Sequence, residues 1–264
     1  MSDFTDIIYE VVDGTTAVVT INRPERYNAF RGKTIEELLT AMKRAWADES
    51  VRAVILTGAG DKAFCTGGDV KQRAETGDYG PTSNGLFEIE NLQRVIREIP
   101  KPVIAAVNGV AVGGGHVLHV LCDLTIASDT ARFGQAGPKV GSFDAGFGNN
   151  YLARVIGEKR AREIWYLCHL YDAQQALAWG LVNKVVPQDQ VLSAAREWAK
   201  EIAEKAPFAI SFLKQSFNAD TDHQSGFLQM ASAALHLYVT TDEAKEGAAA
   251  FAEKRPPDFS RHAL

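Results

Sequence analysis

Two glycine-containing turns are placed where a backbone could bind a reacting oxygen. One is Cys65-Thr66-Gly67-Gly68-Asp69 and the other is Gly113-Gly114-Gly115, and each follows a run of residues typical of a buried strand. Glycine lets a backbone approach a ligand closely, so the N–H groups of Gly68 and Gly114 could together form an oxyanion hole. The second turn also opens a predicted helix, whose dipole favours negative charge at Gly114. Tight turns without a ligand are the alternative for either turn taken alone.

A hydroxyl and a carboxylate, Ser142 and Asp144, stand two residues apart in a glycine-rich stretch. Such a pair is suited to relaying a proton to a ketone oxygen or to the neighbouring carbon. The alternative is that Asp144 caps a helix that begins near Gly148, which is an ordinary role for aspartate.

The histidines and cysteines offer weaker chemistry. His116 and His119 are three apart on one predicted helix, but no third ligand at suitable spacing accompanies them, so we predict no metal site. Cys65 lies beside the first glycine turn without a recognisable partner histidine, which favours a small buried thiol over a nucleophile.

The elements that must hold these turns alternate between strands and helices. Asp13-Gly14 predicts a tight hairpin between Ile7–Val12 and Thr16–Ile21. Hydrophobic spacing then predicts helices at Thr34–Ala47, Leu86–Ile99 and Gly114–Cys122, and strands at Val51–Thr57, Val103–Val107 and Leu124–Ala127. Beyond Gly148 the pattern is nearly all helical, with one strand-like run at Leu181–Val186. The chain is therefore an α/β protein with a parallel-rich sheet core wrapped by helices and a helical C-terminal region.

Composition excludes several classes of protein. The 264 residues suit one α/β domain, and 46% hydrophobic with 23% charged residues is ordinary for a globular chain. A net charge of -5 argues against nucleic acid as a partner. No apolar run is long enough to span a membrane, and three cysteines without a CxxC pair, together with an acidic N-terminus that lacks a signal-type apolar run, favour a cytoplasmic protein.

Three segments resemble the crotonase (enoyl-CoA hydratase/isomerase) superfamily: INRPERYNAF, DKAFCTGGD and KPVIAAVNGVAVGGGHVLHVLCDLTIAS. The resemblance runs from about Ile7 to Phe259. It implies a coenzyme A thioester as substrate, with Gly68 and Gly114 at the two positions whose N–H groups hold the thioester oxygen. It also implies residues 1–200 as a crotonase-type α/β core and 201–264 as a helical region used in trimer packing and active-site completion. The expected assembly is a homotrimer or a homohexamer.

The two glutamates of a hydratase of this superfamily are missing. Val117 stands at the first position and Gly137 at the second, so the acid and base needed to add water across a double bond are absent. The segments GQAGPKVGSFDAGFG and YLARVIGEKRAREIWYLC instead resemble the branch that contains 1,4-dihydroxy-2-naphthoyl-CoA synthases and 2-ketocyclohexanecarboxyl-CoA hydrolases. In that branch Ser142 and Asp144 match the catalytic pair.

Further site residues follow from the same resemblance. Gln135, Gly137 and Trp165 match the place where some synthases hold bicarbonate as a substitute for a side-chain base, although Trp165 could equally be a core aromatic residue. Tyr238 matches a tyrosine that reaches an active site across a subunit boundary, with an ordinary core or surface tyrosine as the alternative. Lys71, Arg73 and Lys254 match basic residues that meet CoA phosphates or a substrate carboxylate, with a solvated charge as the alternative for Lys254.

Together these residues predict an enzyme that stabilises a thioester enolate for Claisen- or Dieckmann-type carbon–carbon bond chemistry. The leading prediction is a reaction like that of 1,4-dihydroxy-2-naphthoyl-CoA synthase, and the enzymatic alternative is a hydrolase that opens a cyclic β-ketoacyl-CoA. A crotonase-fold binding scaffold is the non-enzymatic alternative. It is disfavoured because both oxyanion positions and the pair of Ser142 and Asp144 are retained.

Overall fold

The computed structural model describes residues 4–262, apart from the side chains of Asp222 and Ser225. Its strands are β1 (Ile7–Val12), β2 (Thr16–Ile21), β3 (Ala53–Gly58), β4 (Ala63–Cys65), β5 (Val103–Val107), β6 (Val110–Val112), β7 (Leu124–Ser128), β8 (Arg132–Gly134), β9 (Leu170–Asp172) and β10 (Lys184–Val186). Its helices are α1 (Gly32–Ala47), α2 (Val70–Thr76), α3 (Ile89–Glu98), α4 (Gly114–Leu121), α5 (Phe147–Ile156), α6 (Glu158–Leu167), α7 (Ala173–Ala178), α8 (Val191–Ala203), α9 (Pro207–Ala219), α10 (Ser225–Tyr238) and α11 (Asp242–Glu253).

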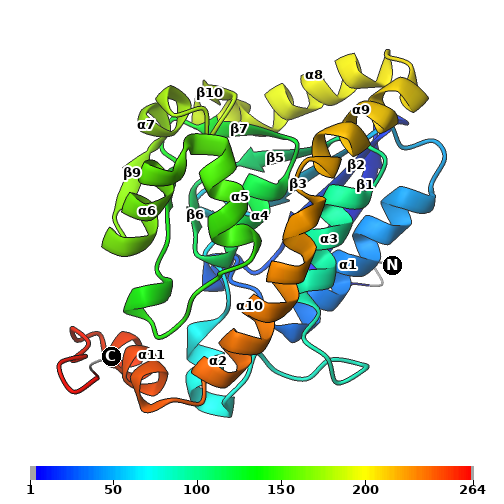
Figure 1. The fold of residues 1–264 in the computed structure, drawn as a ribbon. Helices are drawn as coiled ribbons and strands as arrows, with labels where there is room; N and C mark the ends of the chain where they lie inside the picture. Colours follow the sequence, from blue (N-terminus) through cyan, green and yellow to red (C-terminus); the bar gives the residue numbers. More distant parts are fainter. Residues whose placement is uncertain (1–3, 263–264) are drawn as a thin grey trace.

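The larger sheet has the strand order β1-β2-β3-β5-β7-β10 and is parallel except for its β1 edge. β1 and β2 form the predicted hairpin, in which Val12 pairs with Thr16. The loop between these paired residues has three residues, and the first two, Asp13 and Gly14, both have positive φ, at 53° and 71°, a conformation that glycine, aspartate and asparagine favour in hairpin turns. The prediction of a parallel-rich α/β core is confirmed (Figure 1).

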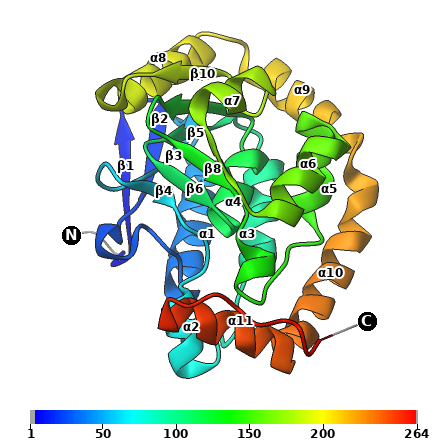
Figure 2. The ribbon, with the colours of Figure 1, turned by 90° about the vertical axis from the view of Figure 1, so that its left-hand side faces the viewer.

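Each central strand of this sheet buries both faces. In β3, Val54 and Leu56 join the core formed with α1, α3 and α4, whereas the alternating Ala53 and Ile55 face α8. This explains why the central strands are continuous runs of apolar residues, since a polar position on either face would be buried without water. Figure 2 shows α8 lying across the far side of the sheet from α1 and α3.

A second, smaller sheet was not predicted from the sequence. It has the order β4-β6-β8-β9, and the first three strands are parallel. The chain passes three times from a strand of the larger sheet to one of the smaller: β3 to β4, β5 to β6, and β7 to β8. The two glycine turns therefore follow β4 and β6, which corrects the prediction that they follow β3 and β5. Three-residue strands are too short to give a recognisable alternation, and this is why they were missed.

The C-terminal helices α9, α10 and α11 lie along the outside of the α/β core of their own chain. α9 packs against α3, and α10 runs along one side of the molecule toward α11, which lies beside α2 (Figures 1 and 2). The helical C-terminal region is thus confirmed, while α2 and α11 were not predicted. Within residues 4–262, no helix combines the length and the apolar character that crossing a membrane requires.

Candidate active site

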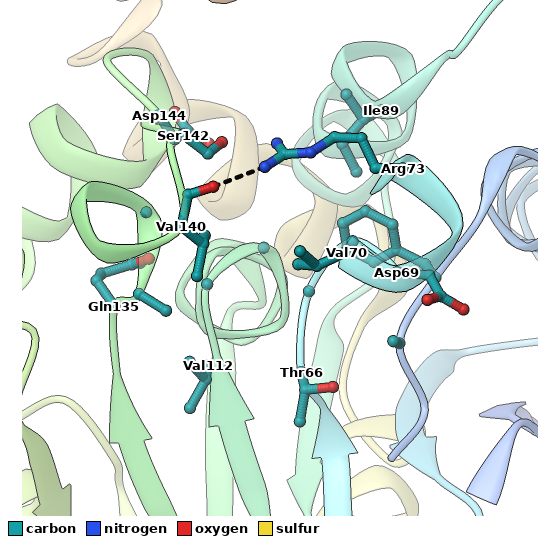
Figure 3. A pocket seen from close by; sticks show the side chains of 18 of the residues that line it. Thr66, Asp69, Val70, Arg73, Ile89, Val112, Gln135, Val140, Ser142 and Asp144 are labelled. Carbon is teal, nitrogen blue, oxygen red and sulfur yellow. Dashed lines mark hydrogen bonds between the residues drawn. The ribbon is translucent and has the colours of Figure 1, made fainter. Parts of the chain in front are cut away.

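A cavity of about 680 Å³ opens where the parallel strands of the smaller sheet end. Its walls come from the loops after β4, β6 and β8, from α3, and from α10 and α11 through Leu228, Ser232 and Phe251. Because these strands are parallel, the three loops leave the sheet at the same edge, which is where α/β proteins place their ligands (Figure 3). The C-terminal region completes the cavity of its own chain.

The first glycine turn presents a free backbone donor. Gly68 forms a parallel bridge with Phe30, in which the Phe30 N–H donates to Gly67 and the Asp69 N–H donates to Phe30, both at 2.8 Å. In such a bridge Gly68, which lies between the two bonded residues Gly67 and Asp69, points its own N–H away from Phe30. Gly68 lines the cavity, and no acceptor for its N–H lies among the residues that the structure describes.

The second donor lies next to the first. Gly113 has a φ of 58°, which favours glycine, and it delivers the chain into α4 so that Gly114 is the first helical residue. The Gly114 N–H has no acceptor in the described part of the chain, as expected for the first residue of a helix. A side-chain carbon at Gly67 would lie 2.8 Å from the Gly114 nitrogen, so the two turns are in direct contact. The predicted pair of neighbouring donors is therefore present, with the positive end of α4 behind it.

Asp144 lies on the loop opposite these donors, and its alternative role as a helix cap is also realised. Its Oδ1 accepts hydrogen bonds from the N–H groups of Gly146 and Gly148, both at 3.0 Å, at the start of α5. A side-chain carbon at Gly148 would lie 2.6 Å from the Asp144 carboxyl carbon, so glycine is needed for this approach. Burial raises the pKa of Asp144, although the hydrogen bonds from Gly148, Gly146 and Gln93 oppose the rise. The carboxyl group therefore retains its proton to a higher pH than an exposed aspartate would.

Ser142 lies beside Asp144 in the same loop (Figure 3). Its backbone N–H donates to Gly137 at 2.9 Å, which fixes the loop, and its hydroxyl has no partner within residues 4–262. The predicted pair is brought together with the hydroxyl available to a ligand.

Two polar residues of α3 also reach this part of the cavity and were not predicted. Gln93 is buried, and its Nε2 lies 3.5 Å from Asp144 Oδ2. Glu90, one turn earlier, lines the cavity and accepts a hydrogen bond from the Ser232 hydroxyl at 2.5 Å. The only sequence signal was an acidic residue in the first turn of a helix, and acidic residues are common there for helix stability alone.

Gln135, Gly137 and Trp165 all line the cavity, as predicted, but the Trp165 N–H is engaged. The indole donates to the backbone oxygen of Gly148 at 2.9 Å. The backbone also leaves no room for a side chain at Gly137, since a side-chain carbon there would lie 2.6 Å from the Ser142 backbone oxygen. The Gly137 N–H has no acceptor in the described chain and remains available as a donor.

The direction of the Gln135 amide depends on His116. Gln135 Nε2 lies 3.3 Å from His116 Nδ1, and both Gln135 Oε1 and His116 Nε2 are buried without partners. Burial lowers the pKa of His116 to about 3, so the ring is neutral and one nitrogen carries the proton. If Nδ1 carries it, the reversed amide accepts that N–H through Oε1, and the Nε2 amide group takes the position that has no protein partner. That orientation offers an anion a second donor in addition to the Gly137 N–H.

The three basic residues predicted to bind CoA or substrate differ in burial and in distance from the cavity. Arg73 is buried and bridges the two sides of the cavity, because its guanidinium donates to the Val140 oxygen at 2.7 Å (Figure 3). It also lies near the Tyr79 hydroxyl, at 3.4 Å. Lys71 is exposed at the cavity edge. Lys254 is an exposed residue that ends α11 with a φ of 56° and does not line the cavity.

Tyr238 lies near the cavity without lining it. Its hydroxyl donates to Glu243 at 2.7 Å, and its ring packs against Phe143 of the same chain at 5.3 Å between centroids. Burial, followed by the bond to Glu243, raises the pKa of Tyr238 to about 12. The proposed role of Tyr238 in another subunit's site therefore stays a prediction.

The remaining candidates for chemistry are packed in the core. Cys65 is fully buried, and burial raises the pKa of its thiol to about 12, so no thiolate is available for catalysis. The rings of His116 and His119 lie 4.9 Å apart beneath the cavity, and no third metal-ligating side chain joins them in the described residues.

Comparison with known proteins identifies the fold and the family. The enoyl-CoA hydratase/isomerase family profile matches residues 12–262. A solved enoyl-CoA hydratase from Bacillus anthracis is 34% identical, with 96% of this chain and 98% of that one covered and a TM-score of 0.74. A carnitinyl-CoA hydratase from Mycobacterium avium is 32% identical, with coverage of 97% and 99% and a TM-score of 0.85. The family match covers nearly the whole chain, and the cavity contains two adjacent free N–H donors. The chain therefore belongs to the enoyl-CoA hydratase/isomerase family and is a crotonase-fold acyl-CoA enzyme.

Proposed function

We propose that this enzyme makes or breaks a carbon–carbon bond beside a CoA thioester, most like 1,4-dihydroxy-2-naphthoyl-CoA synthase. One observation carries the proposal: the free N–H groups of Gly68 and Gly114 line the same cavity as the buried carboxyl of Asp144. Removing a proton from the carbon next to a thioester places negative charge on the carbonyl oxygen. Each well-placed N–H donor contributes roughly 3–4 kcal/mol to stabilising that charge.

Asp144 and Ser142 act on different atoms of the substrate. The raised pKa of Asp144 suits a carboxyl that gives and takes a proton at the α-carbon, and the free Ser142 hydroxyl can hold the oxygen of the ketone or carboxyl group being attacked. Bicarbonate bound at Gly137 and Gln135 would be an alternative base at the same carbon.

Hydration of a simple enoyl-CoA is disfavoured even though several similar proteins are named hydratases. The side chain of Val117 is apolar and buried in α4, and Gly137 offers only backbone groups. Neither position supplies the carboxylate that adds water to a double bond.

A second candidate is the hydrolytic opening of a cyclic β-ketoacyl-CoA. It is favoured by Glu90, a second carboxylate in the cavity, because that reaction consumes water and must remove a proton from it.

Products distinguish these reactions. Purified enzyme is offered succinylbenzoyl-CoA, 2-ketocyclohexanecarboxyl-CoA and crotonyl-CoA in separate reactions, and the products are identified by mass spectrometry. Loss of one water from the first substrate supports ring closure, and gain of one water by the second supports ring opening. Turnover of crotonyl-CoA alone would contradict the proposal.

The assembly is proposed to be a homotrimer or homohexamer in the cytoplasm. Its support is a set of large apolar side chains that stay exposed on α9 and α10 of the single chain: Phe208, Phe212, Phe217, Phe227, Met230 and Leu237. An apolar surface of this kind usually marks a contact with another protein.

A further inference from the structure

Glu90 is the one carboxylate of α3 that lines the cavity. The helix begins at Ile89, so Glu90 is in its first turn, while Glu98, two turns further on, is exposed to solvent away from the cavity. The Ser232 hydroxyl of α10 donates to Glu90 Oε1 at 2.5 Å. This bond leaves Oε2 of Glu90 for another partner and holds the side chain in one direction.

The face of α3 that carries Glu90 also contacts Asp144, through Gln93. Gln93 lies three residues after Glu90, so both side chains leave the helix on one side. The amide of Gln93 reaches Asp144 Oδ2 at 3.5 Å, and the negative charge of Glu90 adds to the rise in the pKa of Asp144. Two carboxyl groups from segments more than 50 positions apart in sequence thus line one cavity.

The proposed chemistry moves protons at two separate atoms. Ring opening takes one proton from water and delivers one to the α-carbon, and ring closure does the reverse with the water that leaves. The Asp144 carboxyl group is held by two backbone hydrogen bonds, so a second carboxyl group in the cavity would serve the second atom without a shift of Asp144.

We propose that Glu90 is a second catalytic carboxylate, which moves the proton of the water molecule consumed or released in the reaction. This inference rests on the proposed function and assigns Ser232 as the positioning residue of Glu90. Asp144 keeps the proton exchanged with the α-carbon.

The step balances as follows in the ring-opening direction. Glu90 accepts a proton from water while the hydroxide oxygen bonds to the ketone carbon, and the π electron pair of the ketone moves onto its oxygen. The C=O bond then re-forms as the bond between that carbon and the α-carbon breaks, and the electron pair of the broken bond moves onto the thioester oxygen held by Gly68 and Gly114. Protonated Asp144 gives its proton to the α-carbon, and the proton on Glu90 then restores Asp144. The products are a carboxylic acid and a saturated thioester in one molecule.

Two measurements separate the roles. Exchange of the α-proton of cyclohexanecarboxyl-CoA with D2O reports enolate formation alone, because this thioester has no ketone. Turnover of 2-ketocyclohexanecarboxyl-CoA or succinylbenzoyl-CoA, whichever the wild-type enzyme converts, reports bond cleavage or formation. Glu90→Gln should lower turnover about 100- to 1,000-fold, within the range of general acid–base catalysis, and leave exchange within about 3-fold of wild type.

Matched variants keep the result interpretable. Glu98→Gln changes the same residue type on the same helix away from the cavity and should leave both rates unchanged. Glu90→Ala should be slow and regain at least about 10-fold in turnover with added formate, a rescue that a purely structural role would not allow. The inference is overturned if Glu90→Gln turns over at the wild-type rate or loses exchange and turnover together. A wild-type enzyme with neither activity would instead refute the proposed function.

Discussion

The ring of Tyr79 covers the α-carbon of Gly68, at a place where a side-chain carbon would overlap it. The same ring stacks on Phe87 at 4.8 Å between centroids, so it cannot move away freely. A side chain at Gly68, which supplies one half of the oxyanion hole, would therefore have to displace the Tyr79 ring from its stack with Phe87.

This contact predicts that Gly68→Ala inactivates the enzyme through overlap with Tyr79 and that Tyr79→Ala relieves the defect. The double variant Gly68→Ala/Tyr79→Ala keeps the backbone N–H and should recover to within about 10-fold of Tyr79→Ala alone. Gly68→Pro/Tyr79→Ala removes the N–H and should stay at least about 100-fold slower, as for the loss of one oxyanion donor. Equal turnover in the two double variants would mean that the Gly68 N–H has no catalytic role.

Asp144→Asn should lower turnover by about 100- to 10,000-fold without unfolding the protein. Asparagine retains the oxygen that accepts from Gly146 and Gly148 but has no titratable proton. CoA affinity by calorimetry should be unchanged. Asp144→Ala is the comparison: it should also lose about 0.5–2 kcal/mol of stability, because the start of α5 loses its cap. Turnover near the wild-type rate in Asp144→Asn would contradict the assignment.

The buried histidines predict loss of stability in mild acid. Burial lowers the pKa of His116 to about 3 and lowers that of His119 well below its ordinary 6.5, with the neighbouring His116 contributing. Below pH 6.5 the unfolded chain takes up protons that the folded chain does not, so the free energy of unfolding falls with falling pH. Between pH 7 and 5.5 the pair should account for a loss of about 2 kcal/mol.

Urea denaturation at several pH values measures this effect. The His116→Gln/His119→Gln variant should have a smaller fall in stability over that range than wild type, whatever its stability at pH 7. His236→Gln, a change at an exposed histidine, should reproduce the wild-type slope. Identical slopes for the double variant and wild type would show that the pair does not cause the loss.

Bicarbonate should raise turnover saturably, and nitrate, which is similar in shape but a much weaker base, should compete. Gln135→Leu should remove this dependence by removing the amide donor, while the Gly137 N–H remains. Gly137→Asp is an unsuitable test, because its side chain would overlap the Ser142 backbone. Full wild-type activity in bicarbonate-depleted buffer, unaffected by nitrate, would leave the protein's own carboxyl groups as the bases.

The sequence by itself was sufficient for the α/β class, the hairpin at Asp13-Gly14, most long helices and the two glycine turns. Those features depend on local spacing, which sets the periodicity of buried residues and the positions where glycine is needed. Ser142 and Asp144 were also predictable, since both lie in one short loop whose residues remain neighbours in any fold.

Only the tertiary structure decided the rest of the site. The second sheet, whose short strands end at one edge and bring Gly68, Gly114 and Gln135 together, exists only through pairing between distant segments. Glu90 reaches the site of Asp144, and the Trp165 N–H is taken by Gly148, because of how α3 and α6 pack against the loop before α5. Such contacts depend on the rotation and register of packed helices, which sequence spacing does not specify.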